Sequence, residues 1–365
     1  MDSVNRVNPM IGAVAYAEGT TDAHGFGKTF PGAVTPFGLV QLSPDTITGG
    51  DNGSGYSYEH TTLEGFSFTH MSGVGWYGDL GNFLMTPTVG ELKTARGTPD
   101  APEDGYRSRF SHDTEVAEAG YYAVTLADYG IRAELSAAPR SGILRFAFPE
   151  HAQSRIQIDL SRRVGGTSTE QLVKVVDEHT ICGWMKCPPE GGGWGNGGGK
   201  ADYTVHFCCR FSKPLKRHGV WHADIPTDWA RKNPDVASDA YQSVVAAADV
   251  TYGVREAQGP HLGFFSEFAT TAGEVVTVKC GISFVSIEGA RANLEHDIPH
   301  WDFDAVRTGA RATWAHALSS VHVEGGTDDD RIKFYTALYH SMIDPRSVSD
   351  VNGDYIGADG RVHRA

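Results

Sequence analysis

Apolar residues alternate with polar ones through most of the chain between residues 84 and 285. The alternating runs are short, rich in β-branched and aromatic residues, and separated by Gly, Pro, Asp and Asn. A period of two indicates strands with one buried face, and many short strands of this kind predict an all-β sandwich. A polar stretch at 222–243 is expected to be a long connection. The predicted strands are 121–129, 131–138, 142–148, 154–160, 180–186, 201–211 and 275–285.

The period changes to that of a helix near residue 290. Apolar residues recur on one helical face in the segment 302–321 and again in the segment 325–343. Thr327, followed three residues later by Asp330, matches a capping box and predicts where the second helix begins. The predicted apolar faces are Phe303, Val306, Ala310, Trp314, Ala317 and Leu318, and then Tyr335, Leu338, Tyr339 and Met342.

These periods divide the 365 residues into unequal parts, and a chain of this length favours two domains. We expect a β-sandwich domain over residues 1–288, a helical linker over 289–326, and the start of a helical domain over 327–365. Two helices rarely form a core of their own. The helical domain is therefore expected to be incomplete in this chain, or to need a partner.

The composition narrows the classes of partner. The chain has 45 acidic and 31 basic residues and a formal net charge of −14. This charge argues against nucleic acid and against anionic membrane surfaces as partners, and no stretch has the ~20 apolar residues of a membrane span. Residues 1–12 contain no apolar signal core. We expect a cytoplasmic protein if Met1 is native, and a periplasmic or secreted protein if a signal peptide has been removed.

The five cysteines are odd in number, and none forms a C-x-x-C motif. Cys208 and Cys209 are neighbours on a predicted strand, so their side chains point to opposite faces. The sequence predicts reduced, partly buried thiols and no zinc site. The remaining cysteines are Cys182, Cys187 and Cys280.

A glycine-rich segment, 190–199, contains the pattern G-x-G-x-x-G. A dinucleotide-binding loop follows a strand and opens a helix, whereas here two prolines precede the glycines and a strand pattern follows them. A P-loop is excluded because Ala201, not Ser or Thr, follows Lys200. Two interpretations remain: a long hairpin loop on the surface, or a loop that carries Trp194 toward a binding site.

The first ninety residues follow neither period and are dense in Gly, His, Asp and aromatic residues. Aromatic faces stack on the apolar face of a pyranose ring, and Asp, Asn and His bond its hydroxyl groups. This composition suits a sugar-binding site.

Blocks of sequence in this region resemble a known family. The blocks at 8–12, 28–45, 54–75 and 78–87 together resemble the opening of family-92 glycoside hydrolases. Two later blocks resemble later motifs of the same family in the same order, so the similarity spans essentially the whole chain. The six blocks read NPMIG, KTFPGAVTPFGLVQLSPD, SGYSYEHTTLEGFSFTHMSGVG, GDLGNFLMTP, CRFSKPL (209–215) and KFYTALYHSMIDPRSVSDVNGDYIGADGRVH (333–363).

The resemblance implies an exo-acting α-mannosidase, most commonly of α-1,2-linked mannose in N-glycans or mannans. It also implies an N-terminal β-sandwich, a helical linker and an (α/α)6 barrel, of which this chain holds only the start. Catalysis in the family is calcium-dependent and inverting: a glutamic acid protonates the leaving oxygen and an aspartate activates water. Calcium prefers oxygen ligands and bridges mannose hydroxyls. Activity on α-1,3 linkages or mannose-phosphate diesters is an alternative.

The family's acid, base and calcium ligands lie beyond the motifs matched here, so no catalytic or metal-binding residue is assigned to this chain. The chain alone is expected to be inactive, and its partners are expected to be a mannose-containing oligosaccharide and the remainder of its own catalytic domain. Asp350, Asn352 and Asp354 have the spacing of a calcium loop, but Tyr355 replaces the required glycine and Arg361 the closing glutamate. An EF-hand is therefore not predicted.

The sandwich can still contribute substrate contacts. Trp76 lies among glycines and is a candidate to stack on a sugar, or to lie at a domain interface. His70 and His24 are candidates as well, with a structural role as the alternative. Asp51 and Asn52 could bond sugar hydroxyls or could instead close an Asx-turn. The full set of candidate substrate contacts is Trp76, His70, His24, Asp51, Asn52 and Trp194.

A different class of function remains open: a non-catalytic carbohydrate-binding sandwich with a helical tail. Such a module has no use for two amphipathic helices with nothing to cover them. The helical pattern after residue 290 therefore favours the enzyme.

Overall fold

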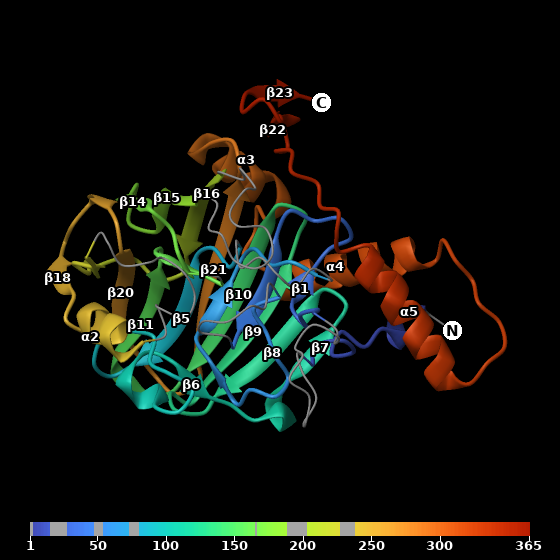
Figure 1. Ribbon diagram of the computed structural model, residues 1–365, viewed down its shortest axis with the longest axis horizontal. Coiled ribbons are helices and arrows are strands. Elements are labelled where there is room, and N and C mark those ends of the chain that lie inside the picture. Colours follow the sequence, from blue (N-terminus) through green and yellow to red (C-terminus); the bar gives the residue numbers. More distant parts are fainter. Residues whose placement is uncertain are drawn as a thin grey trace.

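The computed structural model describes residues 3–14, 28–46, 54–72, 80–164, 166–187, 203–226 and 238–365. Over these residues the β part consists mainly of two antiparallel sheets (Figure 1). The eight-stranded sheet of the described residues has the order β1 (Ala33–Val34), β2 (Gln41–Asp45), β4 (Gly65–Ser67), β5 (Leu84–Val89), β11 (His151–Asp159), β20 (Leu262–Thr270), β17 (Arg217–His222) and β18 (Asp249–Tyr252).

The second sheet has nine strands in the described residues and packs against the first. Its order is β19 (Glu256–Gly259), β14 (Glu170–Val175), β15 (Thr180–Cys187), β16 (Tyr203–Phe211), β21 (Glu274–Ser283), β10 (Ser141–Phe148), β9 (Ile131–Ala137), β8 (Tyr121–Leu126) and β7 (Val116–Glu118). The smaller described elements are the pairs β3 (Thr62–Leu63) with β6 (Ser108–Arg109), β12 (Arg162–Arg163) with β13 (Gly166–Thr167), and β22 (Asp354–Ile356) with β23 (Val362–Arg364), and the short 3-10 helices Ser3–Arg6, Pro102–Asp104 and His112–Thr114.

One apolar core joins the two sheets. Ile156 and Phe264 of the first sheet belong to the same buried cluster as Leu144, Phe146 and Val278 of the second. The core residues of β10 and β21 occupy alternate positions, as the period of two requires for side chains on one face, while helix α3 (Ile287–Asp297) packs against both strands. The predicted β-sandwich is thereby confirmed.

Some elements differ from the prediction. The strands β2 and β4 were not predicted. All of their residues are buried, so apolar and polar residues do not alternate along them. The stretch expected to be a connection contains an α-helix, α2 (Asp239–Ala246), which is capped by Ser238 accepting from the Tyr241 amide.

The cysteines are also paired differently from the prediction. Cys182 is disulfide-bonded to Cys208, and Cys209 is disulfide-bonded to Cys280, while Cys187 is free and buried. The expectation of reduced thiols was wrong for four of the five. In the register of the sheet, Cys208 lies directly opposite Cys182 of β15 and Cys209 directly opposite Cys280 of β21, so the two disulfides link β16 to its two neighbouring strands.

Three helices follow the sandwich: α3 (Ile287–Asp297), α4 (Phe303–Leu318) and α5 (Asp328–Ser341). The predicted face of α4 is buried except for Ala317, which is half-buried, and the indole Nε1 of Trp314 donates to the carbonyl of Val34, 2.7 Å away. Thr327 and Asp330 form the predicted capping box at the start of α5. Trp314 packs on Tyr339 with ring centroids 4.2 Å apart, which couples α4 to α5.

No helix in the described parts of the chain combines the length and apolar character that crossing a bilayer requires.

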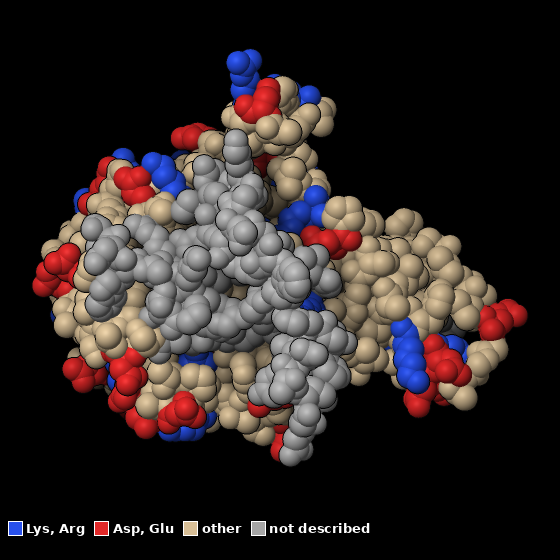
Figure 2. Space-filling view, in the orientation of Figure 1, with Lys and Arg blue, Asp and Glu red and all other residues tan. Residues whose placement is uncertain are grey.

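On the face shown in Figure 2, acidic and basic side chains of the described residues are interspersed rather than gathered by sign. Such a distribution gives no long-range field of one sign over that part of the surface.

Candidate functional site

A network of buried charges lies where β2, β4 and β12 meet. The guanidinium of Arg162 donates to Glu64 Oε2 and to Asp45 Oδ1, both at 2.8 Å, and Arg107 donates to Glu64 Oε1 at 2.7 Å. All four side chains are fully buried. Burial alone would raise the pKa of Asp45, but Arg162 and His70 outweigh it and hold that pKa below its usual range. The network therefore fixes the ionised carboxylate in place.

This network lies among the described residues that flank the predicted sugar contacts in the sequence. Asp45 is the last residue of β2, and the segment 47–53, with Asp51 and Asn52, follows it directly. His70 and Ser72 precede the segment 73–79, which carries Trp76. The described residues that precede the two segments therefore include a base held by buried ion pairs.

His70 belongs to this base. Its Nδ1 lies 2.7 Å from the carbonyl oxygen of Gln41, and its Nε2 lies 3.1 Å from Asp45 Oδ1. Ser67 donates to the other carboxylate oxygen of Asp45 at 2.6 Å. The ring of His70 is fully buried, as expected for a histidine with a structural role. Direct contact of His70 with a sugar stays a prediction.

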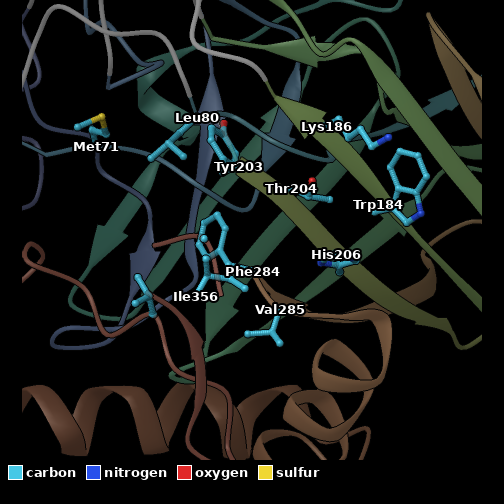
Figure 3. A pocket seen from close by; sticks show the side chains of 12 residues that line it. Met71, Leu80, Trp184, Lys186, Tyr203, Thr204, His206, Phe284, Val285 and Ile356 are labelled. Carbon is cyan, nitrogen blue, oxygen red and sulfur yellow. The ribbon is translucent and has the colours of Figure 1, made fainter. Parts of the chain in front are cut away.

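A groove of about 830 Å³ opens beside this base, between the second sheet and the C-terminal segment (Figure 3). One wall comes from β15, β16 and the turn after β21, and the opposite wall from residues 348–360. Aromatic and aliphatic side chains dominate, with a few polar groups, the usual character of a small-molecule site. The groove is lined by Met71, Leu80, Trp184, Lys186, Tyr203, Thr204, His206, Phe284, Val285, Val348, Ile356 and Gly360.

Buried polar contacts attach the C-terminal wall to the sandwich. Arg346 donates to Gln41 Oε1 at 2.9 Å. Asp350 accepts from Ser283 Oγ at 2.7 Å and from Asn293 Nδ2 at 2.8 Å. Burial raises the pKa of Asp350 above its usual value. The groove therefore has two walls held at a fixed separation.

The described residues do not provide a metal site. No group of three or more His, Cys, Asp or Glu that could hold a metal ion occurs among them. Two of the residues with the spacing of a calcium loop already have other partners. The carboxylate of Asp350 accepts hydrogen bonds from Ser283 and Asn293, and that of Asp354 pairs with Arg364 at 2.7 Å. These residues therefore do not fit calcium, and no catalytic step is derived through it here.

Of the six predicted contacts, His70 alone belongs to the residues that the structure describes. The groove residues Trp184, Lys186 and His206 were missed. Their signal was present, since Trp184 and Lys186 occupy alternate positions of a predicted strand. The pairing of that strand with β16, which completes the site, is not visible in the sequence. The predicted contacts outside the described residues are Trp76, His24, Asp51, Asn52 and Trp194.

Comparison with known proteins places the whole chain in one family. The sequence model of the glycosyl hydrolase family 92 N-terminal domain matches residues 6–283, and that of the family 92 catalytic domain matches residues 289–365. A secreted glycosidase of Arthroderma benhamiae, described as uncharacterised, is 27% identical over 337 residues, covering 89% of this chain and 41% of the relative.

Solved structures agree with this assignment. A family-92 α-mannosidase of Bacteroides thetaiotaomicron is 34% identical, with a TM-score of 0.83, and is matched over 100% of this chain and 44% of its own. The family-92 glycosyl hydrolase ccman5 is 26% identical, with a TM-score of 0.76 and the same coverage. The chain thus spans less than half the length of the relatives it matches. With both family domains matched in order, the chain belongs to glycosyl hydrolase family 92.

Proposed function

We propose that the protein containing this chain is an exo-acting α-mannosidase that releases mannose from oligosaccharides. The observation that supports this most directly is the 34% identity over the entire chain to an α-mannosidase. A structure of that same relative was solved in complex with mannoimidazole. Both family domains follow each other in this chain, which favours an enzyme over an isolated binding module.

The proposed reaction is an inverting, calcium-dependent hydrolysis, with α-1,2-linked mannose of N-glycans or mannans as the preferred substrate. Inversion requires one carboxylic acid to protonate the leaving oxygen and a second carboxylate to activate water on the opposite face of the sugar. We assign neither role to a residue of this chain. Calcium, when bound, would contact the sugar hydroxyls, with ligands from outside the described residues.

The sandwich is proposed to supply the rigid frame of the substrate pocket. The buried pairs of Arg162 with Asp45 and Glu64 hold the base from which the segments 47–53 and 73–79 extend. Positioning of this kind contributes to catalysis because small displacements of a binding group weaken transition-state contacts. Trp76 is the proposed aromatic contact on those segments.

Product analysis with the full-length protein tests the proposal. A panel of α-1,2-, α-1,3- and α-1,6-linked mannobioses and a mannose-phosphate diester would be incubated with it, and the anomer released first would be read by NMR. We expect release of β-mannose, fastest from the α-1,2 dimer, and about tenfold lower kcat/KM for Trp76→Ala. Failure to hydrolyse any of these compounds, with calcium present, would refute the proposed activity.

A further inference from the structure

Four groove residues form a compact patch on the outer face of the second sheet. Trp184 lies directly opposite His206, and Lys186 directly opposite Thr204, in the register of β15 and β16. Residues opposite each other have Cβ atoms about 4.5–5.5 Å apart, and successive residues on one face of a strand lie about 7 Å apart. Such a patch, here called the Trp184 patch (Trp184, Lys186, Thr204 and His206), has the footprint of a single pyranose ring (Figure 3).

Two side chains of the patch retain hydrogen-bonding capacity. Nδ1 of His206 lies 3.3 Å from the carbonyl oxygen of Ser283, which can only accept, so Nδ1 carries the proton and Nε2 is an acceptor. Burial lowers the pKa of His206, which keeps the ring neutral at pH 7. Within the described residues the hydroxyl of Thr204 makes no hydrogen bond. The patch therefore offers both an acceptor and a hydroxyl beside an aromatic face.

The charge of the patch is balanced. The ammonium of Lys186 lies 5.0 Å from the ring centroid of Trp184 and donates to Glu170 Oε2 at 2.7 Å. Gln258 donates to the other oxygen of Glu170 at 2.7 Å. Because the positive charge already has a partner, an anionic ligand gains little here. A neutral ligand with one apolar face and several hydroxyl groups matches this arrangement best.

We propose that the Trp184 patch is a sugar-binding site that binds a mannose unit of an oligosaccharide by stacking it on Trp184. Hydroxyl groups at the edge of the sugar would donate to Nε2 of His206, exchange hydrogen bonds with the hydroxyl of Thr204, and accept from the ammonium of Lys186. The mannose identity rests on the proposed function, whereas the neutral hexopyranose class rests on the patch itself.

The position of the patch suits this role. It lies at one end of the groove, whose other end is lined by Met71 and Leu80, near the ends of the segment that carries Trp76. The groove also lies between residues matched by the two family domains, and binding sites occur preferentially between domains. A branched or extended oligosaccharide could be held there after its terminal residue has been removed.

Calorimetric titration of the full-length protein with a sulfur-linked α-mannotriose, which resists hydrolysis, tests the proposal. We expect Trp184→Ala to weaken binding about tenfold, since a stacked aromatic platform contributes roughly one tenfold step in affinity. Thr204→Val, which keeps the shape of the side chain, should weaken it by a few fold. Trp301→Ala is the matched control, because Trp301 is 43% exposed and does not line the groove. Maltotriose serves as the sugar control.

The outcomes separate this proposal from the proposed activity. Unchanged affinity in both patch variants, with their folds intact by circular dichroism, would overturn sugar binding at the Trp184 patch and leave the proposed mannosidase activity untouched. A fall in melting temperature without a change in affinity would show that polypeptide fills the groove, and would also overturn it. Trp184-dependent binding without hydrolysis of any mannoside would support the patch and contradict the activity.

Discussion

Individual buried charges explain how the described parts of the first ninety residues, which follow no regular period, are held in place around β2 and β4. Arg162 is fully buried and satisfies two carboxylates at once, Asp45 and Glu64. Removing two or more ions from water costs several kcal/mol each, which only close pairing with complete hydrogen bonding can offset. Such pairs add little net stability, but losing one partner leaves the others buried and uncompensated. Their value in this fold is the fixed geometry of β2 and β4.

The substitution Arg162→Met tests this view at the level of one residue. It removes the largest of the influences that hold the pKa of Asp45 down, while the burial that raises that pKa stays. We expect a loss of about 3–5 kcal/mol in the free energy of unfolding at pH 7, measured by urea denaturation.

The sign of the pH dependence follows from the same pKa. In the wild type the lowered pKa of Asp45 stabilises the fold above the unfolded value of about 3.9, and this stability is lost as the pH falls through the folded pKa. In the variant, the buried carboxylates of Asp45 and Glu64 have lost Arg162 as a partner, so they destabilise the fold when ionised. Their protonation at low pH removes this destabilisation. The difference between the two proteins should therefore shrink from pH 7 to about pH 4. A constant difference, or one no larger than that of the exposed control Arg109→Met, would contradict the argument.

Several elements were predictable from the period of their apolar residues, although β14, whose burial also alternates, was missed. The strands β8 to β11 and the helices α4 and α5 follow their periods, and the capping residues Thr327 and Asp330 were read correctly. The strands β2 and β4 could not be read, because burial on both faces removes the alternation. Disulfide pairing failed for another reason: it depends on which strands are neighbours, and local sequence does not encode strand order.

The same reason limits prediction of the site. The alternation that places Trp184 and Lys186 on one face is local, but the residues opposite them come from β16, which is separated from β15 by residues 188–202. The buried role of His70 likewise depends on Asp45 and Gln41, which are 25 and 29 residues away. Long-range pairing decides both, and a single sequence carries no direct signal of it.

The cap of α5 gives a test at the level of an element. In Thr327→Ala the amide of Asp330 loses its acceptor, 3.1 Å away, and the reciprocal contact of the capping box is removed as well. We expect a loss of about 1 kcal/mol in the free energy of unfolding, measured by urea denaturation.

Thr313→Ala is the matched control for this change. Thr313 is exposed in the middle of α4 and its hydroxyl donates to the carbonyl of Gly309, so the substitution should be neutral or slightly stabilising. Equal effects of the two substitutions would show that the cap does not hold the first turn of α5.

At the scale of the whole molecule, the groove is formed by two parts of the chain that lie far apart in the sequence. Its sheet wall lies in the part matched by the N-terminal family domain, and its other wall in the part matched by the catalytic domain. Arg346 and Asp350 tie the second wall to β2, β21 and α3. The groove therefore keeps its shape only while both parts remain docked, which links substrate binding to the docking of the domains.

Removal of calcium should separate activity from the stability of the sandwich. We expect the ligands of the calcium proposed for the full-length enzyme to lie outside the described residues, among which no group of three or more His, Cys, Asp or Glu that could hold a metal ion occurs. We expect a chelator to abolish hydrolysis of α-mannosides, and added calcium to restore it, because the ion would act on the sugar hydroxyls. Hydrogen exchange, read by mass spectrometry, should meanwhile show unchanged protection of β10, β11 and β21, whose residues fill the common core. Loss of that protection on chelation would mean that a metal ion stabilises the sandwich itself, and full activity without calcium would refute the proposed dependence.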